Sequence, residues 1–142
     1  MAEQNGIVAE VESFIEQWQA GDSAMKGCFQ ALYRTVCALS GTSLSFVARP
    51  GVSYSLRPRH DNQTSRELFA MIDVIDDEPE ARWLSVCFYG DMITDPEERG
   101  EVIPGGLAGS DGYCFDIYEA DDASVSYLKA RLEEAWSRAA SC

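Results

Sequence analysis

The hydrophobic pattern of this chain changes its period at Gly41. Before that residue, apolar side chains recur at helical spacing over residues 7–18 and again over residues 25–39. After it, apolar and polar residues alternate, as they do in strands that bury one face. Helical spacing returns over residues 120–140. The chain therefore has to place its strands between an N-terminal pair of helices and one C-terminal helix.

Five segments after Gly41 have the composition of strands. Pro50-Gly51 suits the centre of a type II turn, so the first two segments are predicted to form a hairpin. Consecutive strands usually pair with one another, which favours an antiparallel sheet with the helices segregated to one side. We predict a single α+β domain over residues 1–142, with an N-terminal helix pair, a five-stranded, mostly antiparallel sheet, a C-terminal helix and the helices on one face. The strands lie within residues 43–56, 66–75, 82–90 and 112–119.

Alternation within the strands assigns their side chains to two faces. The set predicted to face the core contains Leu84, Val86, Phe88, Tyr113, Phe115 and Ile117. The opposite set contains Trp83, Ser85, Cys87, Tyr89, Cys114, Asp116 and Tyr118, joined by Phe69, Met71 and Ile75. This second set is too apolar for a fully solvated surface, so we expect something to cover it. Cys87 and Cys114 are predicted to share a face on neighbouring antiparallel strands.

The order of helices, antiparallel strands and a final helix that opens on "DDASVSYL" and continues into "RLEEAW" resembles the YdhG-like small bacterial domains. The resemblance extends over most of the chain as an order of elements. That family has no established chemistry, so the resemblance implies a fold and no functional residues.

The chain is strongly acidic, with a net charge of −13. Such a charge repels phosphates, so we expect no nucleic-acid partner. The basic residues are concentrated, because residues 23–60 contain five of them and no acidic residue. The sequence has no apolar run near the ~18 residues of a membrane span and no basic N-terminal region before an apolar stretch. These features predict a cytoplasmic protein that does not associate with membranes.

The cysteines and the acidic clusters do not point to a metal. The five cysteines are an odd number without a C-x-x-C pair, so a disulfide framework or zinc ribbon is not expected and the cysteines are predicted to be reduced. Carboxylates at Asp73 and over residues 76–80 could hold Ca²⁺ or Mg²⁺, but Pro79 favours a solvated turn. We predict no metal and no cofactor.

A group of basic residues follows the predicted hairpin. Guanidinium groups bind carboxylate and phosphate through paired hydrogen bonds, so this group could hold a small anion. The alternative is that these residues pair with acids of the protein itself, such as Asp61 and Glu67, or with the acidic turn of a second subunit. The candidate ligand-binding residues are Arg57, Arg59, His60 and Arg66.

The segment between residues 91 and 111 is long and rich in turn-forming residues. No G-K-[ST] follows its glycines, and it precedes a strand rather than joining a strand to a helix, so it matches neither a phosphate loop nor a dinucleotide fingerprint. Loops of this length are usually functional or disordered. Three interpretations stay open: a cover packed on its own domain, an interface with a partner, or a lid over a ligand.

These observations favour a non-catalytic domain that binds a small molecule or a protein and forms a homodimer. The candidate interface residues are Phe69, Met71, Tyr89, Ile103, Leu107 and Tyr118. The alternative is a small enzyme that acts on an anionic metabolite. In that case the arginines would bind the substrate, and His60, the only histidine, would be the acid or base.

Overall fold

A computed structural model of the chain describes residues 2–18, 23–107 and 109–141. Its helices and strands follow one another in the order that the sequence pattern predicts, with one additional strand. The elements are α1 (Ala2–Gln17), α2 (Ser23–Ala38), β1 (Thr42–Arg49), β2 (Ser53–His60), β3 (Met71–Ile75), β4 (Trp83–Phe88), the short 3-10 helix η1 (Gly90–Met92), β5 (Glu101–Leu107), β6 (Ser110–Ile117) and α3 (Asp122–Ala139).

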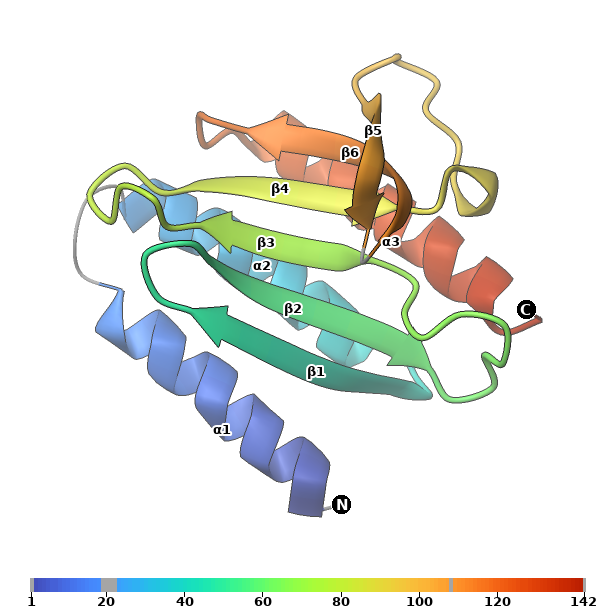
Figure 1. Ribbon diagram of the computed structural model, residues 1–142, viewed down its shortest axis with the longest axis horizontal. Helices are drawn as coiled ribbons and strands as arrows, with labels where there is room; N and C mark the ends of the chain where they lie inside the picture. Colours follow the sequence, from blue (N-terminus) through green and yellow to red (C-terminus); the bar gives the residue numbers. More distant parts are fainter. Residues whose placement is uncertain (1, 19–22, 108, 142) are drawn as a thin grey trace.

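The strands form one antiparallel sheet in the order β1-β2-β3-β4-β6-β5 (Figure 1). The predicted α+β class and antiparallel sheet are confirmed. The predicted number of strands is wrong, because the sheet has six. The extra strand, β5, comes from the glycine-rich segment that the sequence pattern predicts to be a loop.

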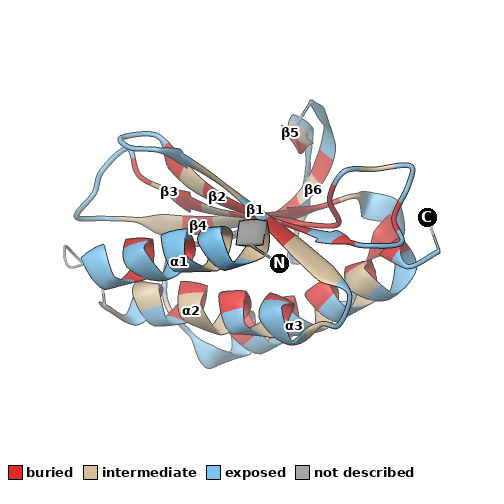
Figure 2. Cartoon of the chain, turned by 90° about the horizontal axis from the view of Figure 1, so that it is seen from below, coloured by how far each residue is buried: buried red, intermediate tan, exposed pale blue. Residues whose placement is uncertain are grey.

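All three helices lie against the same face of the sheet (Figure 2). The apolar stripes of α1, α2 and α3 meet the inner side chains of the strands in one core. The set predicted to face this core is confirmed: Leu84, Val86, Phe88, Phe115 and Ile117 are buried there, and Tyr113 packs against them. Asp121 begins α3, since its carboxylate accepts the backbone N–H of Ser124 at 2.7 Å.

β5 pairs with β6 and curls over the other face of the sheet, which has no helix and is called the open face below (Figures 1 and 2). The β5–β6 register shifts between Ile103 and Leu107. Gly105 (φ +69°), in the irregular part of β5, and Gly109 (φ +93°), in the turn before β6, have left-handed backbone, which glycine adopts without strain. The curl places Leu107, fully buried, in a small apolar cluster with Leu68, Met71, Cys87 and Cys114.

Cys87 and Cys114 lie directly opposite each other in β4 and β6 and form a disulfide. The prediction that they share a face on antiparallel neighbours is confirmed, and the prediction that they are reduced is wrong. Antiparallel register brings their Cα atoms to 4.1 Å although 27 positions separate them in the sequence. The spacing of cysteines along the chain contains no information about that register.

α1 also contacts the edge of the sheet at β1. The side-chain Nε2 of Gln4 donates to the carbonyl of Leu44 at 3.1 Å, and the Leu44 N–H donates to Oε1 of Gln4 at 2.7 Å. A single glutamine side chain therefore occupies both main-chain groups of one residue on an edge strand.

Candidate interaction surface

The open face consists of rows of side chains that cross the sheet, because every second residue of each strand points to this side. The strand register fixes the members of each row. The first row contains Ser45, Arg57, Met71, Cys87, Cys114 and Glu101. The second row contains Val47, Ser55, Asp73, Ser85 and Asp116.

One half of the open face, over β1 and β2, is basic. Arg57 is half-buried and its Nε donates to the hydroxyl of Ser55 at 3.0 Å. Arg59 is exposed and donates to the carbonyl of Gln63 at 2.7 Å. Arg49 is exposed at the end of β1. These arginines come from the acid-free part of the sequence, so the uneven charge along the chain becomes an uneven charge across the sheet.

The middle of the open face contains a carboxylate that is incompletely satisfied. Asp73 lies on β3, and its neighbour Ser55 is a hydrogen-bond partner. Its Oδ1 is buried and has no hydrogen-bond partner among the described residues. Burial raises the pKa of Asp73 above its usual value, which the Ser55 hydrogen bond and the charges of Arg57 and Arg49 only partly offset. A buried acceptor without a donor costs free energy, so this carboxylate destabilises the folded chain when it is ionised.

The other half of the open face, over β5 and β6, is acidic and partly apolar. A cleft of about 420 Å³ lies between the two strands and is lined by Glu101, Ile103, Cys114, Asp116 and Tyr118. Tyr118 is 64% exposed and stacks on Trp83 with ring centroids 4.7 Å apart. Ile103 is 41% exposed. Exposed apolar side chains beside carboxylates are typical of the rim and core of a protein interface.

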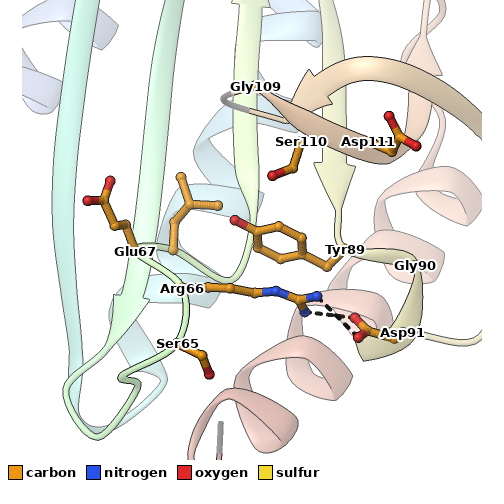
Figure 3. Close-up of a pocket in the computed structure, with 10 residues that line it drawn as sticks. Ser65, Arg66, Glu67, Tyr89, Gly90, Asp91, Gly109, Ser110 and Asp111 are labelled. Carbon is orange, nitrogen blue, oxygen red and sulfur yellow. Dashed lines mark hydrogen bonds and ion pairs between the residues drawn. The ribbon is translucent and has the colours of Figure 1, made fainter.

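A second, larger cleft of about 780 Å³ lies on the other side of the β5–β6 hairpin (Figure 3). The guanidinium of Arg66 lies over the ring of Tyr89, 4.0 Å from its centroid, and donates to both carboxylate oxygens of Asp91 at 2.8 and 3.2 Å. Glu67 and Asp111 also line the cleft. The arginine is thus already paired with Asp91, and two further acidic residues line the same cleft, which does not favour an anion here.

The four predicted ligand-binding residues lie on different parts of the fold. Arg57 and Arg59 share the open face of β2, whereas Arg66 lies in the second cleft beside Asp91. His60 is buried on the helix side of the sheet, with its ring 5.9 Å from that of Trp136 in α3. The structure thus brings together two of the four residues.

His60 is held by the turn that follows it. Its Nδ1 accepts the backbone N–H of Asn62 at 3.0 Å, and its own N–H donates to the side chain of Gln63 at 3.1 Å. His60 is the last residue of β2 and does not follow the hairpin, and alternation along β2 turns it toward α3. The geometry therefore gives His60 the role of a packed turn residue.

The six predicted interface residues have different environments. Ile103 and Tyr118 are exposed on the open face, Tyr89 is half-buried under Arg66, and Met71 and Leu107 belong to the apolar cluster that β5 covers. Phe69 is fully buried in the main core. It precedes β3 and its N–H bonds to the carbonyl of Pro58, so the alternation of β3 does not extend to it.

The acidic turn after β3 is used by the fold itself. The carboxylate of Asp76 accepts from the backbone N–H of Gly51 at 2.8 Å and from Nε of Arg82 at 2.7 Å. No group of three or more His, Cys, Asp or Glu side chains within residues 2–18, 23–107 and 109–141 could hold a metal ion. The solvated-turn interpretation therefore needs one change, since Asp76 is buried and paired.

A second structural carboxylate, Asp95, fastens the connection between η1 and β5. One oxygen accepts from the hydroxyl of Tyr127 and the N–H of Arg99, and the other from the hydroxyl of Tyr113 (2.6 Å) and the N–H of Gly100 (2.9 Å). Burial alone would raise the pKa of Asp95, but these hydrogen bonds outweigh it and hold the pKa well below its usual value. The bond to Asp95 in turn raises the pKa of Tyr113 to about 12.

No protein-family model matches this chain, and comparison with curated proteins and with solved structures finds no significant similarity. In the part of the chain that the structure describes, none of the helices has the length and apolar character needed to cross a membrane.

Proposed function

We propose that this protein is a non-catalytic interaction domain that associates with a second copy of itself through the open face of its sheet. The observation that carries the proposal is the cleft on that face in which exposed apolar side chains lie beside the carboxylates of Glu101 and Asp116. The exposed Ile103 and Tyr118 supply apolar area at one side of the same surface.

A protein partner fits this face better than a small molecule does. The polar, basic and apolar side chains extend over all six strands and do not converge on one enclosed point. Protein interfaces have this broad arrangement, whereas small-molecule sites are concave and bury most of the ligand.

The test compares two neighbouring apolar residues of β5. Ile103 lines the cleft on the open face, and Val102, which is 61% exposed, points to the other side of the strand. Wild-type protein should sediment as a dimer at micromolar concentration. Ile103→Asp should shift the equilibrium to monomer, because the new charge would be buried against the second copy, and Val102→Asp should leave the dimer intact. A wild-type chain that stays monomeric at high micromolar concentration, or equal effects of the two variants, would contradict the proposal.

A further inference from the structure

The two cysteines of the disulfide differ in their access to solvent. Both belong to the apolar cluster that β5 covers, and both are largely buried. Cys114 also lines the cleft of about 420 Å³ between β5 and β6. Cys87, on β4, lies on the far side of Cys114 from this cleft. A molecule that enters the cleft therefore meets Cys114 first.

The strand order gives the cleft a direction relative to the disulfide. Because β6 lies between β4 and β5, Cys87, Cys114 and Glu101 follow one another along one row of side chains. A thiolate that cleaves a disulfide attacks one sulfur from the side opposite the other, and the second sulfur leaves. A thiolate in the cleft approaches Cys114 from the side away from Cys87. The geometry thus makes Cys114 the attacked sulfur and Cys87 the leaving sulfur.

The leaving sulfur has a hydrogen-bond donor beside it. Ser85 lies two residues before Cys87 on the same face of β4, and its Oγ is 3.7 Å from Sγ of Cys87. A disulfide sulfur has no proton, so the hydroxyl of Ser85 is the donor. When the bond breaks, the same hydroxyl stabilises the negative charge that develops on Cys87, because a hydrogen bond to an ionised acceptor is stronger.

We propose that the cleft between β5 and β6 is a thiol–disulfide exchange site for a neutral or positively charged dithiol. A thiolate of the dithiol attacks Sγ of Cys114, the bond between Cys87 and Cys114 breaks, and Cys87 leaves as a thiolate that takes a proton from solvent. The second thiolate of the dithiol then attacks the dithiol sulfur of this mixed disulfide, and Cys114 leaves and takes a second proton. The protein gains two electrons and two protons, and the dithiol is oxidised to a disulfide.

The carboxylates of the cleft select the charge of the thiol. Glu101 is directly opposite Cys114 in the β5–β6 register, so it lies beside the path of the incoming thiolate, and Asp116 lines the same cleft. Both carboxylates repel an anionic reagent, whereas an ammonium group near the thiol is attracted. The walls formed by Ile103 and Tyr118 are apolar and suit the carbon chain of the reagent. A thiol that carries a carboxylate is therefore disfavoured.

The exchange site does not depend on self-association. A second copy on the open face would cover the cleft, so the exchange belongs to the free chain. Its rates are therefore measured at nanomolar chain concentration, below the range proposed for the dimer.

Two monothiols of opposite charge test the first step. Thioglycolate carries a carboxylate and cysteamine carries an ammonium group. Glu101→Gln should raise the rate of disulfide cleavage by thioglycolate by roughly threefold or more, and the rate with cysteamine by less, because the removed charge repels the anionic reagent more strongly. Glu133→Gln removes the same charge from an exposed position of α3 and should leave both rates unchanged. Acid quenching, alkylation and mass spectrometry measure the rates.

Peptide mass spectrometry of the same early samples identifies the attacked sulfur. The reagent should be found on Cys114 and the alkyl group on Cys87. Ser85→Ala should slow cleavage by the same factor with both reagents, since the hydroxyl acts on the leaving sulfur. The reagent on Cys87, or divided equally between the two cysteines, would overturn the proposal, as would equal effects of Glu101→Gln and Glu133→Gln. The cleavage would then pass through unfolded chains, whatever the sedimentation experiment shows about the dimer.

Discussion

At the scale of single residues, Asp73 and Asp95 illustrate two opposite uses of a carboxylate. Asp95 has four donors and holds a connection in place, whereas Asp73 is half-buried and one of its oxygens is buried without a donor among the described residues. The first stabilises the folded monomer when it is ionised. The second stabilises the folded monomer when it is protonated, because burial penalises the charge.

The pKa of Asp73 leads to a prediction for the monomer. A raised pKa means that the folded state binds this proton more tightly than the unfolded chain, so stability is lost as the pH rises above the unfolded value of about 3.9. In the monomeric Ile103→Asp background, Asp73→Asn should raise the melting temperature at pH about 7, and the increase should shrink as the pH falls toward about 4. Asp116→Asn, at an exposed position, is the control. A lower melting temperature for Asp73→Asn at neutral pH would contradict the conclusion that the ionised Asp73 carboxylate destabilises the folded chain.

Asp95 predicts the opposite pH dependence. Its lowered pKa gives stability that is present above about pH 3.9 and is lost as the pH falls below that value. Asp95→Ala should cost about 1–2 kcal/mol at neutral pH, toward the lower end for charged hydrogen bonds because the site is partly exposed. The free energies of unfolding of the wild type and of Asp95→Ala, measured by urea titration, should converge as the pH becomes acidic. The exposed Glu98→Ala is a control, and equal losses in both variants would remove the special role of Asp95.

At the scale of elements, the disulfide joins β4 to β6, the strand with which β5 pairs. Closing a loop of 27 positions should stabilise the fold by about 3.5 kcal/mol. The disulfide also removes two thiols from reaction. Protein that is denatured and alkylated without reductant should therefore gain two fewer alkyl groups than reduced protein, as measured by mass spectrometry. Cys87→Ser should lower the melting temperature and Cys37→Ser, at an exposed position, should not. Equal alkylation with and without reductant would show that the bond is not formed.

The sequence predicts those elements whose apolar spacing is regular. The stripes of α1, α2 and α3 and the alternation of β4 and β6 were sufficient to assign their buried faces, because burial of one face requires that spacing. β5 has no such pattern, since Pro104, Gly105 and Gly106 are poor strand formers. It is a strand because β6 supplies its hydrogen bonds and Leu107 anchors its end, and both of these are tertiary effects.

The candidate site was less accessible to sequence reasoning. Arg57 and His60 are three positions apart, and alternation turns them to opposite faces of β2, so closeness in sequence was a poor guide to a cluster. Asp73 was grouped with the acidic turn that follows it. Asp73 is two residues from Met71 and from Ile75, which indicates that the three side chains share the open face. No sequence pattern shows that its oxygen has no donor.

At the scale of the whole molecule, the net charge of −13 makes most approaches between two copies repulsive. The arginines of β1 and β2 form the region of the open face where an acidic partner surface is attracted. Electrostatics of this kind select an orientation and speed association more than they add affinity. The same distribution thus opposes random contacts between acidic surfaces.

The Gln4–Leu44 contact has a consequence for assembly. An edge strand with free N–H and C=O groups is a template on which further chains can add, and such addition has no natural end. Here the glutamine side chain takes the place of the next strand at Leu44, and at the opposite edge β5 bends out of the sheet plane (Figure 1). Growth by strand addition is therefore hindered at both sides. The proposed face-to-face association closes after two chains, so a rise in concentration should fill dimers rather than seed fibres.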